Sequence, residues 1–213
     1  MKIVIASLLI FVSFSGFGQS DPKSEQILNT FSKEIKSLNS FYMEFSLHFL
    51  NKATGEDSKQ KGNGFVQGDK FSAKLDDNEV ISNGMKIWTI VHSEKVVYES
   101  DADDDDEESI NPKKLLTIWE TGFKSKYEKE DVINGKKVHV INLYPTNPAE
   151  VQYHTITLYV DVNGKELHKA IMKTKEGTTM TYTVTKMDKN VAVDKSKFVY
   201  DARKFPGYQL IRD

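Results

Sequence analysis

The sequence predicts an α+β fold built mostly of antiparallel β-sheet, and changes of pattern along the chain support this prediction. Apolar residues after Asp21 first recur with the spacing of one helix face, and from Phe41 they alternate with other residues, as in a half-buried strand. Turn dipeptides then follow, among which Asn-Gly is the strongest hairpin signal. The Asn-Gly pairs are Asn83-Gly84, Asn134-Gly135 and Asn163-Gly164. We therefore expect an N-terminal helix that leads into a meandering sheet.

The first residues are typical of a secretory signal peptide, which we expect to span residues 1–18. Lys2 supplies a positive charge, the apolar run of residues 3–14 is too short to cross a bilayer, and Gly18 is a small residue at the expected cleavage site. The chain has no cysteine that could carry a lipid anchor. We therefore predict an exported, soluble protein with one domain over residues 19–213.

The first helix and the first strand are the clearest elements. Asp21 and Pro22 are typical of a helix start, because aspartate caps free N–H groups and proline fits the first helical position. The apolar stripe of this helix, about four turns long, consists of Ile27, Leu28, Phe31, Ile35 and Leu38. The apolar positions of the strand are Phe41, Met43, Phe45, Leu47 and Phe49. The strand therefore follows the helix directly.

Short strands account for most of the remaining chain. We expect them at residues 60–67, 70–76, 78–82, 85–91, 95–100, 123–130, 136–144, 154–161, 166–174 and 178–187, with a last one near 198. One segment interrupts them: between Asn111 and Gly122 the apolar residues are spaced like a helix face. No repeat and no linker rich in Gly, Ser or Pro divides the chain, which indicates a single domain.

An extended antiparallel sheet with two apolar helices predicts a curved sheet whose inner face is covered by the helices. Such a shape can enclose an apolar cavity for a ligand. The same pattern is also typical of helices that simply complete a packed core. The residue pattern alone leaves both possibilities open.

Composition and motifs argue against several classes of function. A net charge of −2 gives no electrostatic attraction to nucleic acid. The five histidines lack the close spacing of metal ligands, and the chain contains neither a thiol nor a Gly-x-Ser-x-Gly motif for nucleophilic catalysis. We therefore expect no metal site, no cofactor, no nucleic-acid partner and no enzymatic activity.

The acidic run from Asp101 to Glu108 begins with the ligand spacing of a calcium loop. Asp106 stands where an EF-hand has glycine, and Pro112 stands where it has glutamate, so an EF-hand is excluded. The run is more typical of a solvated surface loop, with weak cation binding as the alternative.

Short motifs spread over the whole chain point to a family. They are Gly64-Phe65, Lys70-Phe71, Ser82-Asn83-Gly84 with Trp88, the Asn111 to Trp119 helix, Leu143-Tyr144-Pro145, Ile156 to Asp161 with Asn163-Gly164, Gly177-Thr178, Phe198 and Phe205-Pro206-Gly207-Tyr208. The chain is also predicted to be exported, it lacks cysteine, and its first helix runs into a Phe-rich strand. In these features and in the order of its motifs, the sequence resembles the outer-membrane lipoprotein carrier family, LolA.

The resemblance implies a half-open β-barrel with helices that form a lid over an apolar cavity, in the periplasm of a Gram-negative cell. The ligand would be an acylated lipoprotein. It would be received from an inner-membrane ABC-type exporter and delivered to an outer-membrane receptor or to the outer membrane itself. Gln19 as the first residue after cleavage, in place of a lipid-bearing cysteine, indicates the diffusing carrier, which we expect to be a monomer.

The resemblance also suggests which residues form the site. We expect the cavity to be lined by Phe45, Leu47, Phe49, Phe65, Phe71, Leu75, Trp88, Ile90, Leu115, Ile118 and Trp119. The family has an arginine just before the strand that begins here at Lys70, where it ties the sheet to the lid. Lys70 is the candidate latch, although a lysine lacks the planar guanidinium group that makes paired hydrogen bonds.

Two other functions remain compatible with this resemblance. One is a carrier of the same fold for a different lipid, such as a glycolipid or a polyketide. The other is a periplasmic regulatory protein that senses lipoproteins, and such proteins usually carry a second domain that this sequence does not show. An apolar cavity would bury the acyl chains of either lipid and would not show which headgroup they carry. The sequence therefore does not distinguish a lipoprotein carrier from a carrier of another lipid.

Overall fold

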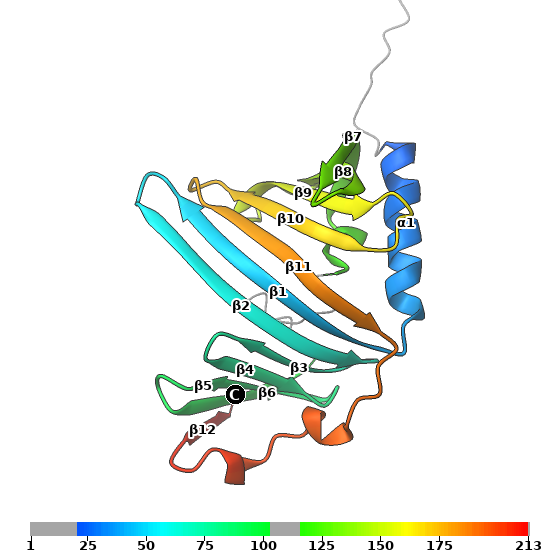
Figure 1. The fold of residues 1–213 in the computed structure, drawn as a ribbon. Helices are drawn as coiled ribbons and strands as arrows, with labels where there is room; N and C mark the ends of the chain where they lie inside the picture. The colour runs from blue at the N-terminus through cyan, green and yellow to red at the C-terminus, as the bar shows by residue number, and fades with distance from the viewer. Residues whose placement is uncertain (1–20, 103–115, 213) are drawn as a thin grey trace, which may run out of the picture.

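The computed structural model describes residues 21–102 and 116–212 (Figure 1). The predicted signal peptide, the acidic residues from 103 to 108 and the first part of the predicted second helix lie outside the described residues. The described chain folds into one helix, α1 (Pro22–Ser37), a 12-stranded sheet and three short 3₁₀ helices. No described helix has both the length and the apolar character needed to cross a lipid bilayer.

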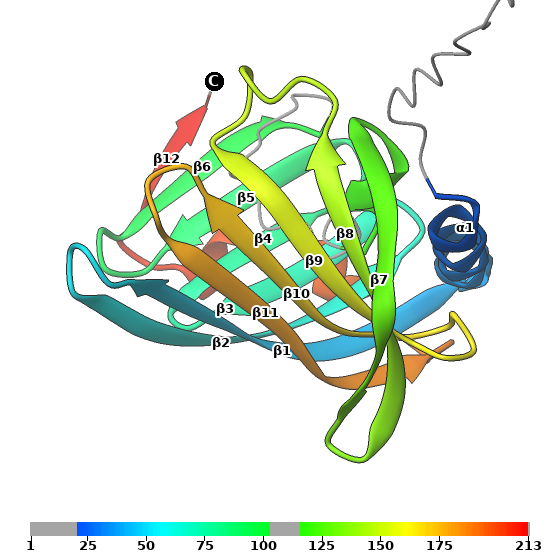
Figure 2. The same ribbon diagram turned by 90° about the horizontal axis from the view of Figure 1, so that it is seen from above.

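The sheet is a meander that starts in its middle. Its strands are β1 (Ser40–Asn51), β2 (Glu56–Gln67), β3 (Lys70–Leu75), β4 (Asn78–Ser82), β5 (Lys86–Val91), β6 (Val96–Asp101), β7 (Phe123–Ile133), β8 (Lys136–Pro145), β9 (Tyr153–Asp161), β10 (Leu167–Thr174), β11 (Thr179–Lys189) and β12 (Gln209–Arg212). Their spatial order is β12-β6-β5-β4-β3-β2-β1-β11-β10-β9-β8-β7. Viewed from above, the sheet curves round on itself without closing (Figure 2). The predicted class, mostly antiparallel and open, is confirmed.

The expected strands match the observed ones closely, but the hairpin turns are more varied than expected. Asn134 and Gly135 both have positive φ, at 50° and 79°, as a type I′ turn requires. Asn83 and Asn163 are not among the residues with positive φ, although the glycine after each of them is. The Asn163 turn is longer because the Asp161 carboxylate accepts hydrogen bonds from the backbone N–H groups of the turn.

The expected strand near residue 198 is wrong. Residues Lys195–Phe198 form a 3₁₀ helix, η2, because the Asp194 carboxylate accepts a hydrogen bond from the Ser196 N–H group and Phe198 is buried. The last strand is β12 instead, and it pairs with β6 in parallel, whereas every other pair in the sheet is antiparallel. The C-terminal segment thus returns to the edge of the β3 to β6 half.

Two apolar clusters lie on opposite faces of the sheet. The larger cluster joins side chains of both halves of the sheet to α1 and to the 3₁₀ helix η1 (Ile118–Glu120), and we call its side the inner face. The smaller cluster centres on Ile81, Ile90 and Val97 and is covered by the C-terminal aromatic residues, and we call its side the outer face. Strand alternation keeps the two sets apart, because neighbouring residues of a strand point to opposite faces.

Gly62 makes room for the ring of Phe45 in β1. It lies opposite Phe45 in the β1–β2 register, and a Cβ atom at this position would come within 2.3 Å of the Phe45 ring and 2.9 Å of the Lys74 carbonyl oxygen. Gly62→Ala should therefore destabilise the protein by about 1–3 kcal/mol, the usual cost of overpacking a core. Urea unfolding measures this loss.

A double mutant tests the cause of this loss. In a Phe45→Leu background the two nearest atoms, both of the ring, are gone, so Gly62→Ala should cost clearly less than in the wild type. Equal costs in the two backgrounds would show that the Phe45 ring is not the reason for the glycine.

Asp161 should make stability depend on pH. Burial, the largest single influence, raises its pKa, but hydrogen bonds from the backbone N–H groups of Lys165, Glu166 and Asn163 together outweigh it and leave the pKa lowered. A carboxyl group with a lowered pKa stabilises the fold above its unfolded-state pKa, and this stabilisation is lost as the pH falls through its folded-state pKa.

At neutral pH, Asp161→Asn should lower the free energy of unfolding by about 1 kcal/mol. The difference between the wild type and the variant should shrink as the pH falls below the ordinary carboxyl value of 3.8, and unfolding curves at several pH values measure it. Asp77→Asn, at an exposed turn position, is the control variant and is measured at the same pH values. A constant difference across this pH range would contradict the assignment.

Candidate functional site

The candidate site is the inner face of the open sheet together with α1, which flanks it. Paired residues of β1 and β2 on this face are apolar or glycine: Phe41 pairs with Val66, and Met43 pairs with Gly64. Both Phe41 and Met43 are almost fully buried. The same face continues through Tyr182 of β11 and Leu158 of β9. A continuous apolar surface therefore extends over both halves of the sheet.

The inner face is less completely covered toward the β1–β2 turn. Leu47 and Phe49 of β1 are only half-buried, and so are Met180, which pairs with Phe49, and Met172, which pairs with Met180. Methionine side chains are flexible and fill irregular spaces. At this end of the inner face, four neighbouring apolar side chains are therefore partly exposed.

Five of the residues predicted to line a cavity share the inner face. Phe45 and Phe71 are buried in its cluster, and Leu47 and Leu75 pack against that cluster. Phe49 follows on the same face by strand alternation. These five therefore lie on one surface, and their role as the lining of a cavity stays a prediction.

Three of the predicted residues lie on the opposite face and do not join them. Phe65 stacks against Tyr42, with ring centroids 4.7 Å apart, and Trp88 stacks against Tyr200 at 5.6 Å. Ile90 is fully buried in the outer cluster. Their assignment to the same cavity as Phe45 is a correction, and its cause is the strand phase: a shift of one residue moves a side chain to the other face.

The last three predicted residues belong to the segment before β7, where the sequence predicts a helix between the strands. Leu115 lies outside the described residues, and Ile118 is placed in η1 although its side chain is not described. Trp119 is buried, its ring centroid is 4.9 Å from that of Phe31, and its indole N–H donates a hydrogen bond to the Ser32 hydroxyl at 3.1 Å. Trp119 thus joins α1 to η1.

The N-terminal end of α1 is held by the edge strand β7. The Asp21 N–H donates to the Ser125 carbonyl at 2.9 Å, and the Asp21 carboxylate accepts from the Tyr127 N–H at 2.9 Å. The hydroxyl groups of Ser24 and Ser125 form a buried hydrogen bond of 2.8 Å. The ammonium group of Lys23 lies 3.6 Å from the centre of the Tyr127 ring. All these contacts are polar or electrostatic.

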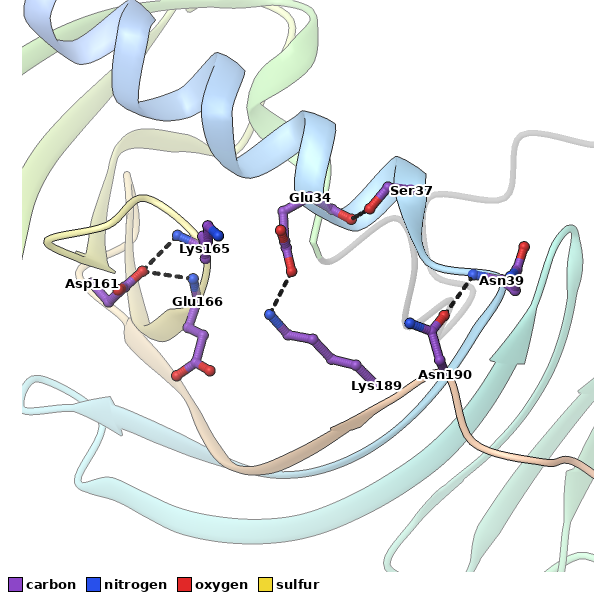
Figure 3. A network of polar contacts seen from close by, with 8 residues as sticks. All are labelled: Glu34, Ser37, Asn39, Asp161, Lys165, Glu166, Lys189 and Asn190. Atoms are coloured by element: carbon purple, nitrogen blue, oxygen red, sulfur yellow. Dashed lines mark hydrogen bonds and ion pairs between the residues drawn. The ribbon is translucent and has the colours of Figure 1, made fainter.

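The C-terminal half of α1 is held by ion pairs. Glu34 pairs with Lys189 of β11 at 2.7 Å, and Lys36 pairs with Glu120 of η1 at 2.8 Å. Just beyond α1, the Asn39 N–H donates to the Asn190 side-chain carbonyl at 3.1 Å. Figure 3 shows Glu34 and Lys189 reaching toward each other between the helix and the sheet.

Lys70 does not take part in this attachment. Its side chain is exposed at the start of β3, and it forms no ion pair with any residue in the described ranges. Its role as a latch stays a prediction. The Glu34–Lys189 pair instead links the helix to the sheet, and the sequence carries no local signal for it because the two residues are 155 positions apart.

A groove of about 540 Å³ runs between α1, η1 and the start of β7, and we call it the α1–β7 groove. Its helix side carries Glu25, Asn29 and Lys36, and its opposite side carries Thr121 and Phe123. The sequence reasoning missed it, since the groove exists only where the helix and the sheet edge come together. Its volume lies within the range of small-ligand sites.

Comparison with solved structures finds a chain of similar fold, together with more distant matches. An uncharacterized conserved protein from Thermus thermophilus matches with a TM-score of 0.61 at 8% identity, over 90% of this chain and 99% of that chain. A LolA superfamily protein from Nitrosomonas europaea has a TM-score of 0.47 at 11% identity, over 83% and 97% of the two chains. LprF from Mycobacterium bovis has a TM-score of 0.48 at 14% identity, with the same coverage.

Comparison with sequences identifies the family. No curated protein is significantly similar to this chain. The family model described as outer membrane lipoprotein carrier protein LolA, however, matches residues 36–201, from the end of α1 to beyond η2. That range covers most of the chain and includes the strands from β1 to β11. The chain therefore belongs to the LolA family.

Proposed function

We propose that this protein is a periplasmic carrier that shields the acyl chains of lipoproteins and moves them from the inner to the outer membrane. The observation that carries the proposal is the apolar inner face of a sheet that does not close. In this proposal the cargo comes from an inner-membrane ABC-type exporter and goes to an outer-membrane receptor or to the membrane itself. The carrier acts as a monomer and catalyses no reaction.

The energetics of transfer favour a shield of this kind. Each buried CH₂ group contributes roughly 0.8 kcal/mol, so an acyl chain of about sixteen carbons loses on the order of 10 kcal/mol if it crosses water unprotected. The half-buried Leu47, Phe49, Met172 and Met180 offer the apolar surface that such a chain would cover. Flexible side chains at this end suit a ligand that must also leave.

The attachment of α1 suits a movable lid. Apart from its apolar stripe, α1 is held by hydrogen bonds and ion pairs to β7, β11 and η1. Water can replace such polar partners when the helix moves, so their net cost of separation is small. In this proposal α1 moves away from the inner face to admit acyl chains, and the exporter supplies the energy for loading.

Lipid extraction tests the carrier proposal. Protein purified from its native periplasm should carry acylated species that mass spectrometry detects. The purified mature protein should also accept a lipoprotein in a release assay with membranes that contain the exporter. Absence of both results would overturn the proposal.

The ion pair between Glu34 and Lys189 tests the lid. Lys189→Met should weaken the attachment of α1, by about 1 kcal/mol for a half-buried pair, and should speed both amide exchange in residues 22–37 and release of a bound acyl probe. Hydrogen exchange and probe dissociation measure the two effects.

Lys186→Met provides the matched control for this test. It removes the exposed ion pair between Lys186 and Asp188 on the same strand, which does not reach α1. Exchange in α1 should then stay at the wild-type rate. If both variants release the probe equally fast, the Glu34 pair does not control the lid.

A further inference from the structure

We propose that the α1–β7 groove binds the first residues of the cargo polypeptide, in extended form, beside its acylated end. The inference rests on the proposed carrier function and adds to it a polar subsite for the peptide. It is independent of where on the inner face the acyl chains lie. The occupant is a peptide rather than a lipid, for three structural reasons.

The first reason is the chemistry of the groove walls. Seven of its ten lining residues are polar or charged, so an acyl chain would gain little by lying there. Asn29 is exposed on the helix side, and its side chain makes no hydrogen bond to another of the described residues. Its amide can both donate and accept, as peptide backbone requires, and the hydroxyl of Thr121 lies on the opposite side.

The second reason is the edge of the sheet. The Ser125 carbonyl and the Tyr127 N–H face outward from β7, because both bond to Asp21 rather than to β8. Outward backbone groups recur at every second residue of an antiparallel strand, so those of Phe123 face the same edge, within the groove. Asp21 already occupies the edge at Ser125 and Tyr127, so the backbone groups of Phe123 are the ones that can hydrogen-bond to an extended peptide, as in strand addition.

The third reason is the length and position of the groove. Glu25 and Lys36 mark its helix side, and a helix rises about 16 Å over that interval, which matches roughly five extended residues. The groove floor includes Leu28 and Trp119, which also belong to the inner-face cluster. A peptide in the groove could therefore continue into acyl chains on the inner face.

Two synthetic ligands test this subsite. One is a lipidated cysteine followed by five polar residues, and the other is the same lipidated cysteine as a simple amide. The mature wild type should bind the lipopeptide roughly tenfold more tightly than the amide, as expected from one or two additional net hydrogen bonds. Asn29→Trp, which fills the groove from an exposed helix position, should abolish this preference and leave affinity for the amide unchanged.

The control is Gln26→Trp, which adds the same bulk to an exposed position of α1 outside the groove lining and should keep the preference. Equal wild-type affinity for the two ligands would overturn the subsite and leave the carrier proposal intact. Loss of the preference in both variants would also overturn it. Failure to bind either ligand would overturn the carrier proposal, and the subsite with it.

A second measurement does not depend on the fold of the tryptophan variants. Because the chain has no cysteine, Asn29→Cys and Gln26→Cys each introduce one thiol whose rate of modification reports its accessibility. The lipopeptide should protect the thiol at position 29 several-fold and leave the thiol at position 26 unprotected, whereas the lipidated cysteine amide should protect neither. Protection of both positions by both ligands would assign the effect to α1 as a whole and contradict the subsite.

Discussion

The pairing of β1 with β2 on one side and β11 on the other is the interaction on which the rest of the structure depends. β1 stands in the middle of the strand order, and its register with β2 runs unbroken from Ser40 to Asn51. Strands β3 to β6 continue the sheet beyond β2, and β10 to β7 continue it beyond β11, so the register with β1 decides which side chains of both halves face inward. The absence of a side chain at Gly62 lets Phe45 occupy that face without a clash.

An open sheet leaves two faces to cover, and different parts of the chain cover them. The inner face meets α1 and η1, and the outer face of β3 to β6 meets the aromatic residues Tyr200, Phe205 and Tyr208. The outer cover packs through aromatic rings, whereas much of the attachment of α1 is polar. Both covers bury apolar side chains, since Leu28, Phe31 and Ile35 of α1 belong to the inner-face cluster. The two covers therefore differ in the polar contacts that α1 makes in addition, which water can replace when the helix moves.

The α1–β7 groove and the inner face meet at Trp119. Its ring packs on Phe31 within the apolar cluster, and its N–H bonds to Ser32 in the groove floor. An amphipathic side chain is suited to such a boundary, because its ring and its N–H group prefer different surroundings. A ligand with an apolar part and a polar part could thus be held on both sides of one residue.

The sequence by itself determined the class of fold, the bounds of most elements and the family, because helix spacing, strand alternation and turn dipeptides are local properties of the chain. It also predicted Phe45, Phe71 and Trp119 to share one cavity lining, and the structure places all three in the buried cluster of helix and sheet. It did not separate Phe65, Trp88 and Ile90 from them. Alternation divides the residues of each strand between two faces, but it does not tell which residues of a later strand lie on the same face as Phe45. The Glu34–Lys189 pair, the parallel β12 and the α1–β7 groove were decided only by the tertiary structure. Each of them joins residues far apart in the chain, whose contact depends on which strands lie side by side and where α1 packs on the sheet.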